Sequence, residues 1–406
     1  MLFKIIFKNL FHKPLGTTLS VALLSLSTGI ISLLLLLQNQ LEQKFENDLR
    51  DIDLVVGAKG SPLQLVLSAV YHVDAPTGNI PEAEVEKIRQ LRSVAQVIPL
   101  AYGDSYQRFR ILGTDTSYIG KYSGVLREGR LFQQNLEAVL GATVAANTGL
   151  SVGQTFFGTH GEAEEGEKHN QAGYTVVGVL KESNSVLDNL ILTNVASVWS
   201  VHEEHHEEGG AAHDDHDHEH AAVDTMPHEI TAALVKARST MAVMTLPRML
   251  NETTNLQATI PALEINRLMK LLGIGVATLQ ALAIGIMLIS GFSVFIALYN
   301  RLRERRYELA LMRSLGCSRL RLFVLLISEG LLLALAGFAG GVLLSRLAIW
   351  LLNTTAAQDF HLVFRYNFIA AEGVLLLVAL GVGLLAALIP AAKAFRMDLS
   401  TALADA

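Results

Sequence analysis

The chain has 406 residues, of which 51% are hydrophobic and only 17% charged, a composition that argues against an ordinary soluble enzyme. Its net charge of −6 conceals an asymmetry, because residues 38–268 carry 17 Lys and Arg against 31 Asp and Glu, whereas the rest carries 15 against 7. The single cysteine, Cys317, excludes an intramolecular disulfide and a cysteine-rich zinc site. Together these features indicate a membrane protein with segments in two compartments.

Four stretches are long and apolar enough to cross a bilayer as helices. The first has no charged residue and is followed by QNQLEQKFENDL rather than by a cleavage site, which predicts an uncleaved anchor. The expected spans are residues 17–37, 269–299, 322–352 and 373–392. They separate an amphipathic N-terminal segment, an outer domain, a basic loop, a short outer loop and a tail, at residues 1–16, 38–268, 300–321, 353–372 and 393–406.

Basic residues set the expected orientation, because they gather on the cytoplasmic side of membrane proteins. Seven arginines lie within residues 301–321, and lysines precede the first span and follow the last. Both termini and the basic loop are therefore expected in the cytoplasm. The acidic residues 38–268 are expected on the periplasmic side of the inner (plasma) membrane.

The outer domain alternates between strand and helix periodicity, which predicts an α+β fold. DIDLVVGA and AQVIPLAYG are typical of strands, PEAEVEKIRQL (81–91) is typical of a helix, and residues 138–183 indicate a β-rich insert. A helix near residues 251–270 is expected to run into the second span. The predicted fold class is a membrane α-helical protein of four transmembrane helices, with a large α+β periplasmic domain between the first and the second.

A histidine-rich and acidic loop is expected at residues 202–224. Its core, HEEHHEEGGAAHDDHDHEH, holds seven of the thirteen histidines beside eight carboxylates. Imidazole binds Zn²⁺ and similar divalent ions, and carboxylates can complete the shell. The candidate ligands are His202, His205, His206, His213, His216, His218 and His220.

Three interpretations of this loop remain open. It can be a mobile segment that senses or buffers a divalent metal, a solvated acidic loop with incidental affinity, or a delivery site for a transported ion. A fixed site needs hydrogen bonds that orient each imidazole, and the glycine-bearing loop offers no obvious scaffold for them. A hydrolytic zinc site is the least expected interpretation, because it would need such a scaffold to fix its ligands.

The third span contains Gly337 and Gly341 at the spacing that lets two transmembrane helices approach closely. Packing within the chain and a dimer seam both fit this spacing. Glu329 is the only Asp, Glu or His within the expected spans. A conduction pathway for a divalent cation is therefore poorly supported.

The segment ERRYELALMRSLGCSRLRLFVLLISEGLLL, residues 304–333, predicts a short helix with Leu309, Met312 and Leu315 on one face, ended by Gly316. It resembles the signature of the FtsX-like, MacB-type (type VII) permeases of ABC transporters, which include LolC/E- and MacB-like members. PAAKAFRMDLSTAL, near the end of the chain, is similar to that family's tail. ILGTDTSYI, LREGRLF and GLSVGQTF are similar to parts of its periplasmic core.

This resemblance implies a permease that forms a homodimer and docks on two copies of a separate cytoplasmic ATPase. It implies an outer domain split into a porter and a β-rich subdomain, which moves when the ATPases close (mechanotransmission). The residues implied in ATPase coupling are Arg306, Glu308, Leu311, Arg313, Leu315 and Gly316. The alternative for this helix is an interfacial segment attracted to anionic lipid headgroups.

No P-loop of the G-x-x-x-x-G-K-[ST] kind occurs in the sequence, so ATP and Mg²⁺ are expected on the partner and no catalytic residue on this chain. The expected task is extraction of a lipoprotein or lipid, export of a peptide or small molecule with an outer partner, or regulation of an envelope enzyme. The expected partners are membrane lipids and a periplasmic or lipoprotein partner, without nucleic acid. A zinc-type metal transporter whose histidine-rich loop delivers the ion is the alternative. A membrane-anchored binding module without an ATPase is a third hypothesis, which leaves the basic coupling segment without a purpose.

Overall fold

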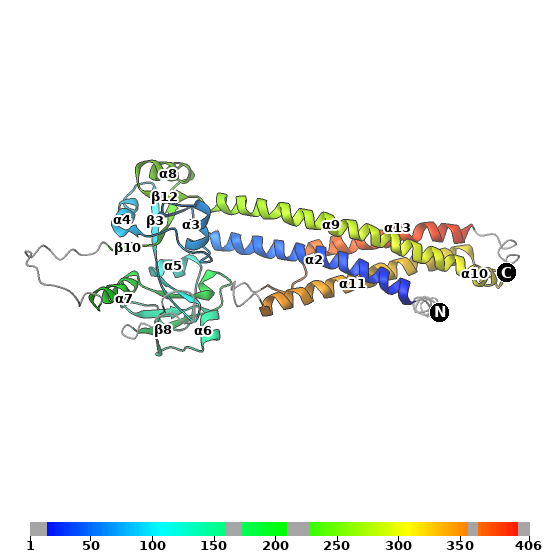
Figure 1. Ribbon diagram of the computed structural model, residues 1–406, viewed down its shortest axis with the longest axis horizontal. Coiled ribbons are helices and arrows are strands. Elements are labelled where there is room, and N and C mark those ends of the chain that lie inside the picture. Colours follow the sequence, from blue (N-terminus) through cyan, green and yellow to red (C-terminus); the bar gives the residue numbers. More distant parts are fainter. Residues whose placement is uncertain (1–13, 160–172, 209–227, 356–363, 397–406) are drawn as a thin grey trace, which may run out of the picture. The chain divides into compact units, whose positions relative to one another are not determined.

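The computed structural model describes residues 14–159, 173–208, 228–355 and 364–396 (Figure 1). The chain forms two compact units, of which one comprises Met1–Glu42 with Lys270–Ala406 and the other Gln43–Met269. We call the first the membrane unit and the second the inserted domain. Residues 1–13 and 397–406, which belong to the expected N-terminal segment and tail, lie outside the described residues.

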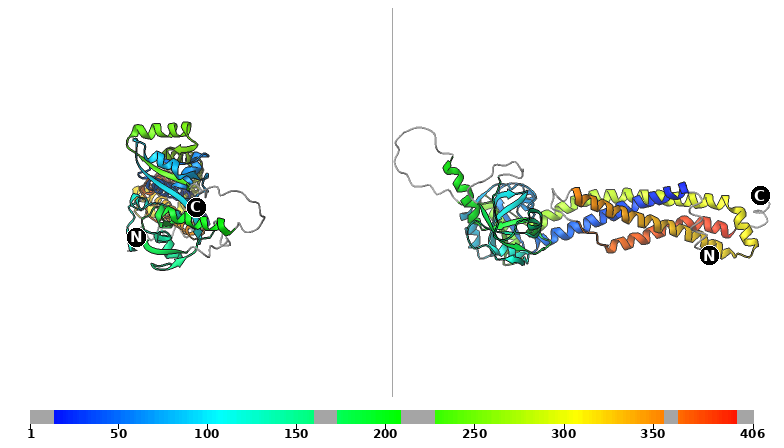
Figure 2. Two further views of the ribbon diagram at one scale, coloured as in Figure 1. Left: turned by 90° about the vertical axis from the view of Figure 1, so that its left-hand side faces the viewer. Right: turned by 90° about the horizontal axis from the view of Figure 1, so that it is seen from below.

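Four helices of the described chain are long and apolar enough to cross a membrane, which identifies a multi-pass membrane protein. They are α2 (Pro14–Leu49), α9 (Pro261–Glu304), α11 (Arg319–Thr355) and α13 (Ala370–Phe395). The short helix α10 (Arg306–Ser314) lies between α9 and α11 in the chain. Within the membrane unit these helices run side by side (Figure 2). Each long helix extends beyond the apolar stretch that predicted it, because backbone hydrogen bonds continue through polar residues.

Glycines bring α11 close to two neighbouring helices. A Cβ atom added to Gly341 would lie 2.8 Å from the backbone nitrogen of Gly29 on α2, and one added to Gly337 would overlap the side chain of Leu24 on the same helix. On another side of α11, a Cβ on Gly330 would lie 2.8 Å from the carbonyl oxygen of Gly383 on α13. Only glycine permits such short distances between helix backbones. In this chain, the face of α11 that carries Gly337 and Gly341 therefore contacts α2.

The inserted domain is built on a ten-stranded mixed sheet, whose path runs β12-β1-β11-β3-β4-β9-β6-β8-β5 with β7 paired to β8. The long strand β3 joins its two halves, because its first part pairs with β11 and its last part with β4. The pairs β4–β9 and β6–β8 are parallel, and β2 and β10 form a separate two-stranded ribbon. The strands are β1 (Leu54–Ala58), β2 (Ile80–Pro81), β3 (Val94–Tyr106), β4 (Phe109–Gly113), β5 (Leu126–Gly129), β6 (Glu137–Leu140), β7 (Thr155–Phe156), β8 (Tyr174–Leu180), β9 (Leu190–Thr193), β10 (Glu229–Ile230), β11 (Ala232–Ala237) and β12 (Leu256–Thr259).

Helices cover both faces of this sheet (Figure 1). Successive strand residues point to opposite faces, so Val55 enters one core while Leu54 and Val56 enter the other. The first core includes α3 and α5, the second includes α4 and α8, and a third lies around α6. The helices are α3 (Pro62–Ala69), α4 (Glu82–Arg89), α5 (Thr116–Lys121), α6 (Ala142–Thr148), α7 (Val195–Glu208) and α8 (Thr240–Thr253), with a 3-10 turn at Val186–Asn189.

Two local expectations are wrong. The helix expected from about residue 251 is interrupted, because α8 ends at Thr253, β12 pairs with β1, and α9 begins only at Pro261. The loop expected from residue 202 begins later, because α7 continues to Glu208. In the first case a partner strand about 200 residues away in sequence decides the local structure, which a local periodicity cannot show.

Candidate functional site

Helix α10 has an exposed apolar stripe. Tyr307, Leu311 and Leu315 follow one another at four-residue intervals and are 51%, 46% and 80% exposed. This spacing places side chains on the same side of a helix. The neighbouring Leu309 and Ala310 are buried and hold α10 against its own unit. The stripe is therefore a surface that the described residues of the membrane unit leave uncovered.

Backbone geometry fixes the end of α10. Gly316 has a φ of +97°, a conformation that residues with a Cβ rarely adopt. Its N–H donates to the carbonyl of Arg313 at 3.0 Å, and the N–H of Cys317 donates to the carbonyl of Met312 at 3.0 Å. These two bonds form a Schellman motif, which closes the helix and turns the chain toward α11.

The residues implied in ATPase coupling occupy this short segment. Arg306, Glu308, Leu311 and Arg313 lie on α10, and Leu315 and Gly316 form its C-terminal end. Glu308 pairs with Arg305 at 3.2 Å. The expectation that Leu315 shares one face with Leu309 and Met312 is wrong, because Leu309 is buried whereas Leu315 is the capping residue and is 80% exposed. Leu315 therefore extends the exposed stripe.

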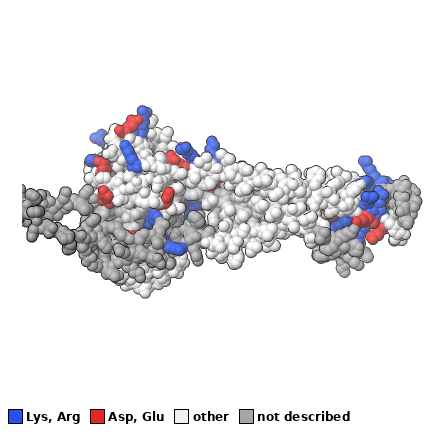
Figure 3. Space-filling view, in the orientation of Figure 1, with Lys and Arg blue, Asp and Glu red and all other residues white. Residues whose placement is uncertain are grey.

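Basic side chains surround α10. On the face shown in Figure 3, the charged side chains of the membrane unit gather at this end of the bundle, and the helices are uncharged over most of their length. Arg303, Arg306, Arg319 and Arg321 are exposed here. An apolar stripe within a basic rim is suited to a partner with a complementary groove or to anionic headgroups.

Within the inserted domain, side chains hold the last turn of α2. The terminal carbonyl groups of a helix have no partner in the helix itself. Three side chains donate to carbonyl oxygens in or just after this turn, and two of the donors come from α5 and the residue after it. The bonds join Tyr71 to Phe45 (3.2 Å), Tyr122 to Asp48 (3.2 Å) and Lys121 to Arg50 (2.7 Å). The end of α2 is thus fixed to the domain by polar contacts.

The first turns of α9 enter the same hydrophobic core as the end of α2. Ile265 is 4% exposed, and Leu268 and Met269 pack against the core that also receives Phe45 and Leu49. Both helices continue without a break into the membrane unit. One core in the inserted domain therefore holds the ends of two membrane helices.

A buried polar cluster joins three helices of the membrane unit. Arg346 Nη2 on α11 lies 2.9 and 2.8 Å from the two carboxylate oxygens of Glu372 on α13. Ser32 on α2 donates to Glu372 at 2.6 Å and lies 3.0 Å from Ser345 Oγ. Glu372 is only 1% exposed. The carboxylate is therefore neutralised by an arginine and fully engaged in hydrogen bonds.

This cluster was not predicted from the sequence. Glu372 was expected at the end of the short loop 353–372, but it lies in the first turn of α13. Arg346 lies within the third expected span, and no role was predicted for it. The sequence does contain a signal for this pair. A positive charge lies within the third span, and a negative charge lies at the start of the fourth.

The histidine-rich sequence is only partly described. His202, His205 and His206 lie in the last turns of α7. His213, His216, His218 and His220 lie outside the described residues. Among the residues that the structure describes, no group of three or more His, Cys, Asp or Glu is arranged to hold a metal ion. The metal site therefore stays a prediction.

Comparison with known proteins assigns both parts of the chain. Residues 281–399 match a family model for the FtsX-like permease C-terminal region, and residues 17–243 match one for the MacB-like periplasmic core domain. No curated protein shows significant similarity to the chain. The periplasmic region of MacB from Actinobacillus actinomycetemcomitans is similar at 13% identity, with a TM-score of 0.36, over 56% of this chain and 98% of that structure. The extracellular domain of the noncanonic ABC-type transporter YknZ from Gram-positive bacteria is similar at 13% identity, with a TM-score of 0.31, over 51% and 98%.

Proposed function

Because the chain belongs to the FtsX-like permeases of ABC transporters that carry a MacB-like core domain, we propose that it converts ATP hydrolysis by a separate cytoplasmic ATPase into movement of its inserted domain. The observation that carries this proposal is the exposed stripe of Tyr307, Leu311 and Leu315 on α10. Apolar side chains turned away from their own bundle suit the groove of a protein partner, in the manner of a helix bound in a groove. The surrounding arginines would orient an acidic partner before contact.

Transmission would follow the two unbroken helices. In the proposed arrangement α10 and both termini face the cytoplasm, and the inserted domain lies on the periplasmic side of the inner membrane. Two permeases and two ATPases would form the working assembly. Closure of the ATPases would shift α10 and its bundle, and α2 and α9 would pass the shift to the core that holds their ends. A continuous α-helix transmits such a displacement because its hydrogen bonds resist stretching.

The proposed work is extraction or export of a lipoprotein or lipid from the periplasmic side. Conduction of a divalent ion would require several free ligands inside the bundle. In the described helices the carboxylate of Glu372 is instead engaged by Arg346 and Ser32. This engagement supports a mechanical role for the bundle over an ion pathway.

The histidine-rich segment is proposed as an accessory that binds a divalent metal such as Zn²⁺ without defining transport. Replacement of His213, His216, His218 and His220 by Gln should lower the number of Zn²⁺ or Ni²⁺ ions bound to the full chain, as measured by equilibrium dialysis. Basal ATP turnover of the assembly should be unchanged, because the bound metal would modify transport but is not required for ATP hydrolysis. Loss of all turnover in this variant would instead favour the metal-transporter alternative.

Site-specific photo-crosslinking tests the docking proposal directly. A benzophenone amino acid at Leu311 should yield, in intact cells, a crosslinked product that contains an ATPase subunit with a P-loop. The same probe at Val152, which is exposed in the inserted domain, is the matched control and should yield no such product. Crosslinks from position 311 to lipid alone would contradict the proposal and favour an interfacial helix.

A further inference from the structure

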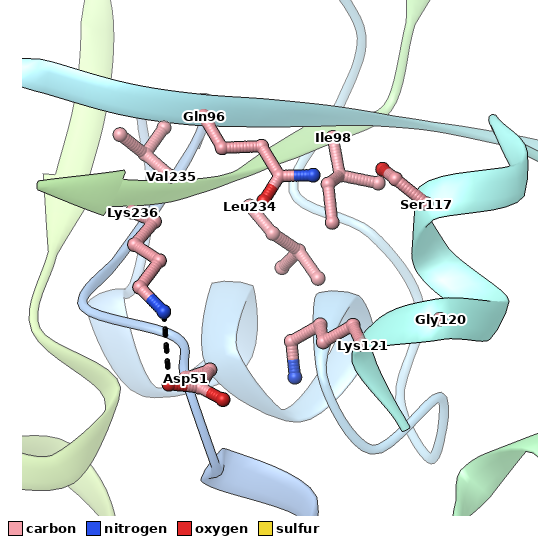
Figure 4. A pocket seen from close by; sticks show the side chains of 9 residues that line it. All are labelled: Asp51, Gln96, Ile98, Ser117, Gly120, Lys121, Leu234, Val235 and Lys236. Carbon is pink, nitrogen blue, oxygen red and sulfur yellow. Dashed lines mark hydrogen bonds and ion pairs between the residues drawn. The ribbon is translucent and has the colours of Figure 1, made fainter. Parts of the chain in front are cut away.

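A pocket of about 290 Å³ opens beside β3 and β11 in the inserted domain (Figure 4). The side chains of Ile98 and Leu234 point into it and are only 4% and 2% exposed. Asp51, which follows the end of α2, lies at one side between Lys121 of α5 and Lys236 of β11. The pocket therefore combines an apolar floor with charged groups from three separate parts of the domain.

The charges in this pocket do not balance. Two lysines face one carboxylate, and Lys236 Nζ already lies 3.0 Å from Asp51 Oδ1. Lys121 Nζ donates to the carbonyl of Arg50 at 2.7 Å and lies 3.9 Å from the centre of the Tyr122 ring. Burial lowers the pKa of the Lys121 ammonium to about 8. For this ammonium the effect of burial therefore outweighs the attraction of the Asp51 and Asp48 carboxylates.

The two ammonium groups also have donors to spare. Each ammonium carries three N–H groups. Within the described part of the chain, Lys121 uses one for the carbonyl of Arg50, and Lys236 uses one for Asp51. The amide of Gln96 lines the same pocket and can also donate to a polar ligand. An oxyanion would satisfy several of these donors at once.

We propose that this pocket binds a small molecule with an anionic head and an apolar stem. A carboxylate or phosphate group would lie between the ammonium groups of Lys121 and Lys236, and the stem would cover Ile98 and Leu234. The volume is at the lower end of that of small-molecule sites, which suits a short stem. The proposal goes beyond the coupling function, because the pocket lies in the inserted domain and its binding can be measured without an ATPase.

Calorimetry on the full chain in detergent micelles tests the charge requirement. n-Butyl phosphate and n-butyrate distinguish the two possible heads, and n-butanol supplies the stem alone. At least one anion should bind saturably, and butanol should not. Lys121→Met and Lys236→Met should each weaken that binding about tenfold or more, since each removes a charge-assisted hydrogen bond. Lys87→Met, at an exposed lysine on α4, should leave it unchanged.

Chemical acetylation of the unaltered chain tests the same pocket without depending on whether the variants fold. Acetylation of Lys121 by an activated ester, followed by mass spectrometry, should slow several-fold when the binding anion is present at saturation, while acetylation of Lys87 should not change. Protection by butanol alone would show that charge is not recognised. The assignment would be overturned if neither anion protects Lys121. It would also be overturned if anion binding persists in both lysine variants.

Discussion

At the scale of single residues, Arg346 and Glu372 form a buried ion pair within the membrane unit. Removal of one partner from a buried ion pair leaves an uncompensated charge, which costs about 3–5 kcal/mol. Arg346→Met should therefore destabilise the chain strongly in denaturant unfolding, and the double variant Arg346→Met with Glu372→Met should recover part of the loss. An exposed pair, Arg248 and Glu252 at 2.9 Å, is the control.

In that control, Glu252→Gln should change the free energy of unfolding by no more than about 1 kcal/mol, because exposed ion pairs are screened by water. Equal effects at the two sites, or a double variant less stable than Arg346→Met, would contradict the account of a buried and mutually dependent pair. Either result would also weaken the argument that Glu372 is not available to a metal ion.

The protonation of His72 should determine how the stability of the inserted domain changes at acidic pH. It lies half-buried between the hydroxyls of Tyr102 and Tyr118, each 2.8 Å from a ring nitrogen. Burial, assisted by the nearby Arg110, lowers the pKa of its imidazole from 6.5 to about 3. Between these pH values the unfolded chain binds the extra proton, so stability should fall as pH falls, by about 1.4 kcal/mol for each pH unit.

Urea unfolding followed by tryptophan fluorescence between pH 7 and pH 5 checks this expectation. His72→Asn removes the titrating group, and asparagine tolerates the left-handed backbone conformation found here (φ +56°). The variant should be less stable at pH 7 but should lose less stability on acidification than the original chain. An identical pH slope in both would contradict the assignment of the acid response to His72.

At the scale of secondary-structure elements, glycine determines how α2 and α11 meet. Gly341→Leu should separate these helices and lower the thermal unfolding midpoint, because a Cβ at this position would lie 2.8 Å from the backbone nitrogen of Gly29. Gly285→Leu on α9 is the matched control, since a Cβ there would have no atom within 4 Å in the described chain. Similar midpoints for the two variants would show that the close approach is not required.

The elements that were predictable from sequence are those whose signal is local. An uninterrupted apolar stretch of about 20 residues identifies a membrane helix on its own. Gly316 similarly identified the end of α10, because only glycine readily adopts the required positive φ. Strand β12 was mistaken for helix, because its pairing with β1 depends on residues far away in the chain.

The candidate sites likewise differ in whether their sequence signal is local or depends on distant residues. The proposed coupling segment was recognisable as a contiguous sequence, but the exposure of Leu315 depends on where the last turn of α10 ends. The pair of Arg346 and Glu372 requires two helices to meet. The pocket brings together Asp51, Lys121 and Lys236 from three distant segments, so no local sequence pattern indicates it.

At the scale of the whole molecule, the central claim is that α10 receives force from a separate ATPase and that α2 and α9 deliver it to the inserted domain. The family assignment, the exposed stripe and the two unbroken helices support that claim. The claim makes the stripe necessary for ATPase activity of the assembly but dispensable for folding of the permease. The buried side of α10 should behave in the opposite way, since Leu309 belongs to the core of the membrane unit.

ATP turnover of the copurified permease–ATPase assembly, measured per permease chain, tests this claim most directly. The variant that combines Leu311→Asp with Leu315→Asp should keep the unfolding midpoint of the original chain, lose the bound ATPase and lose the turnover that depends on the permease. Val152→Asp, at an exposed apolar residue of the inserted domain, should retain both. A doubly substituted permease that still binds the ATPase and supports full turnover would contradict the account.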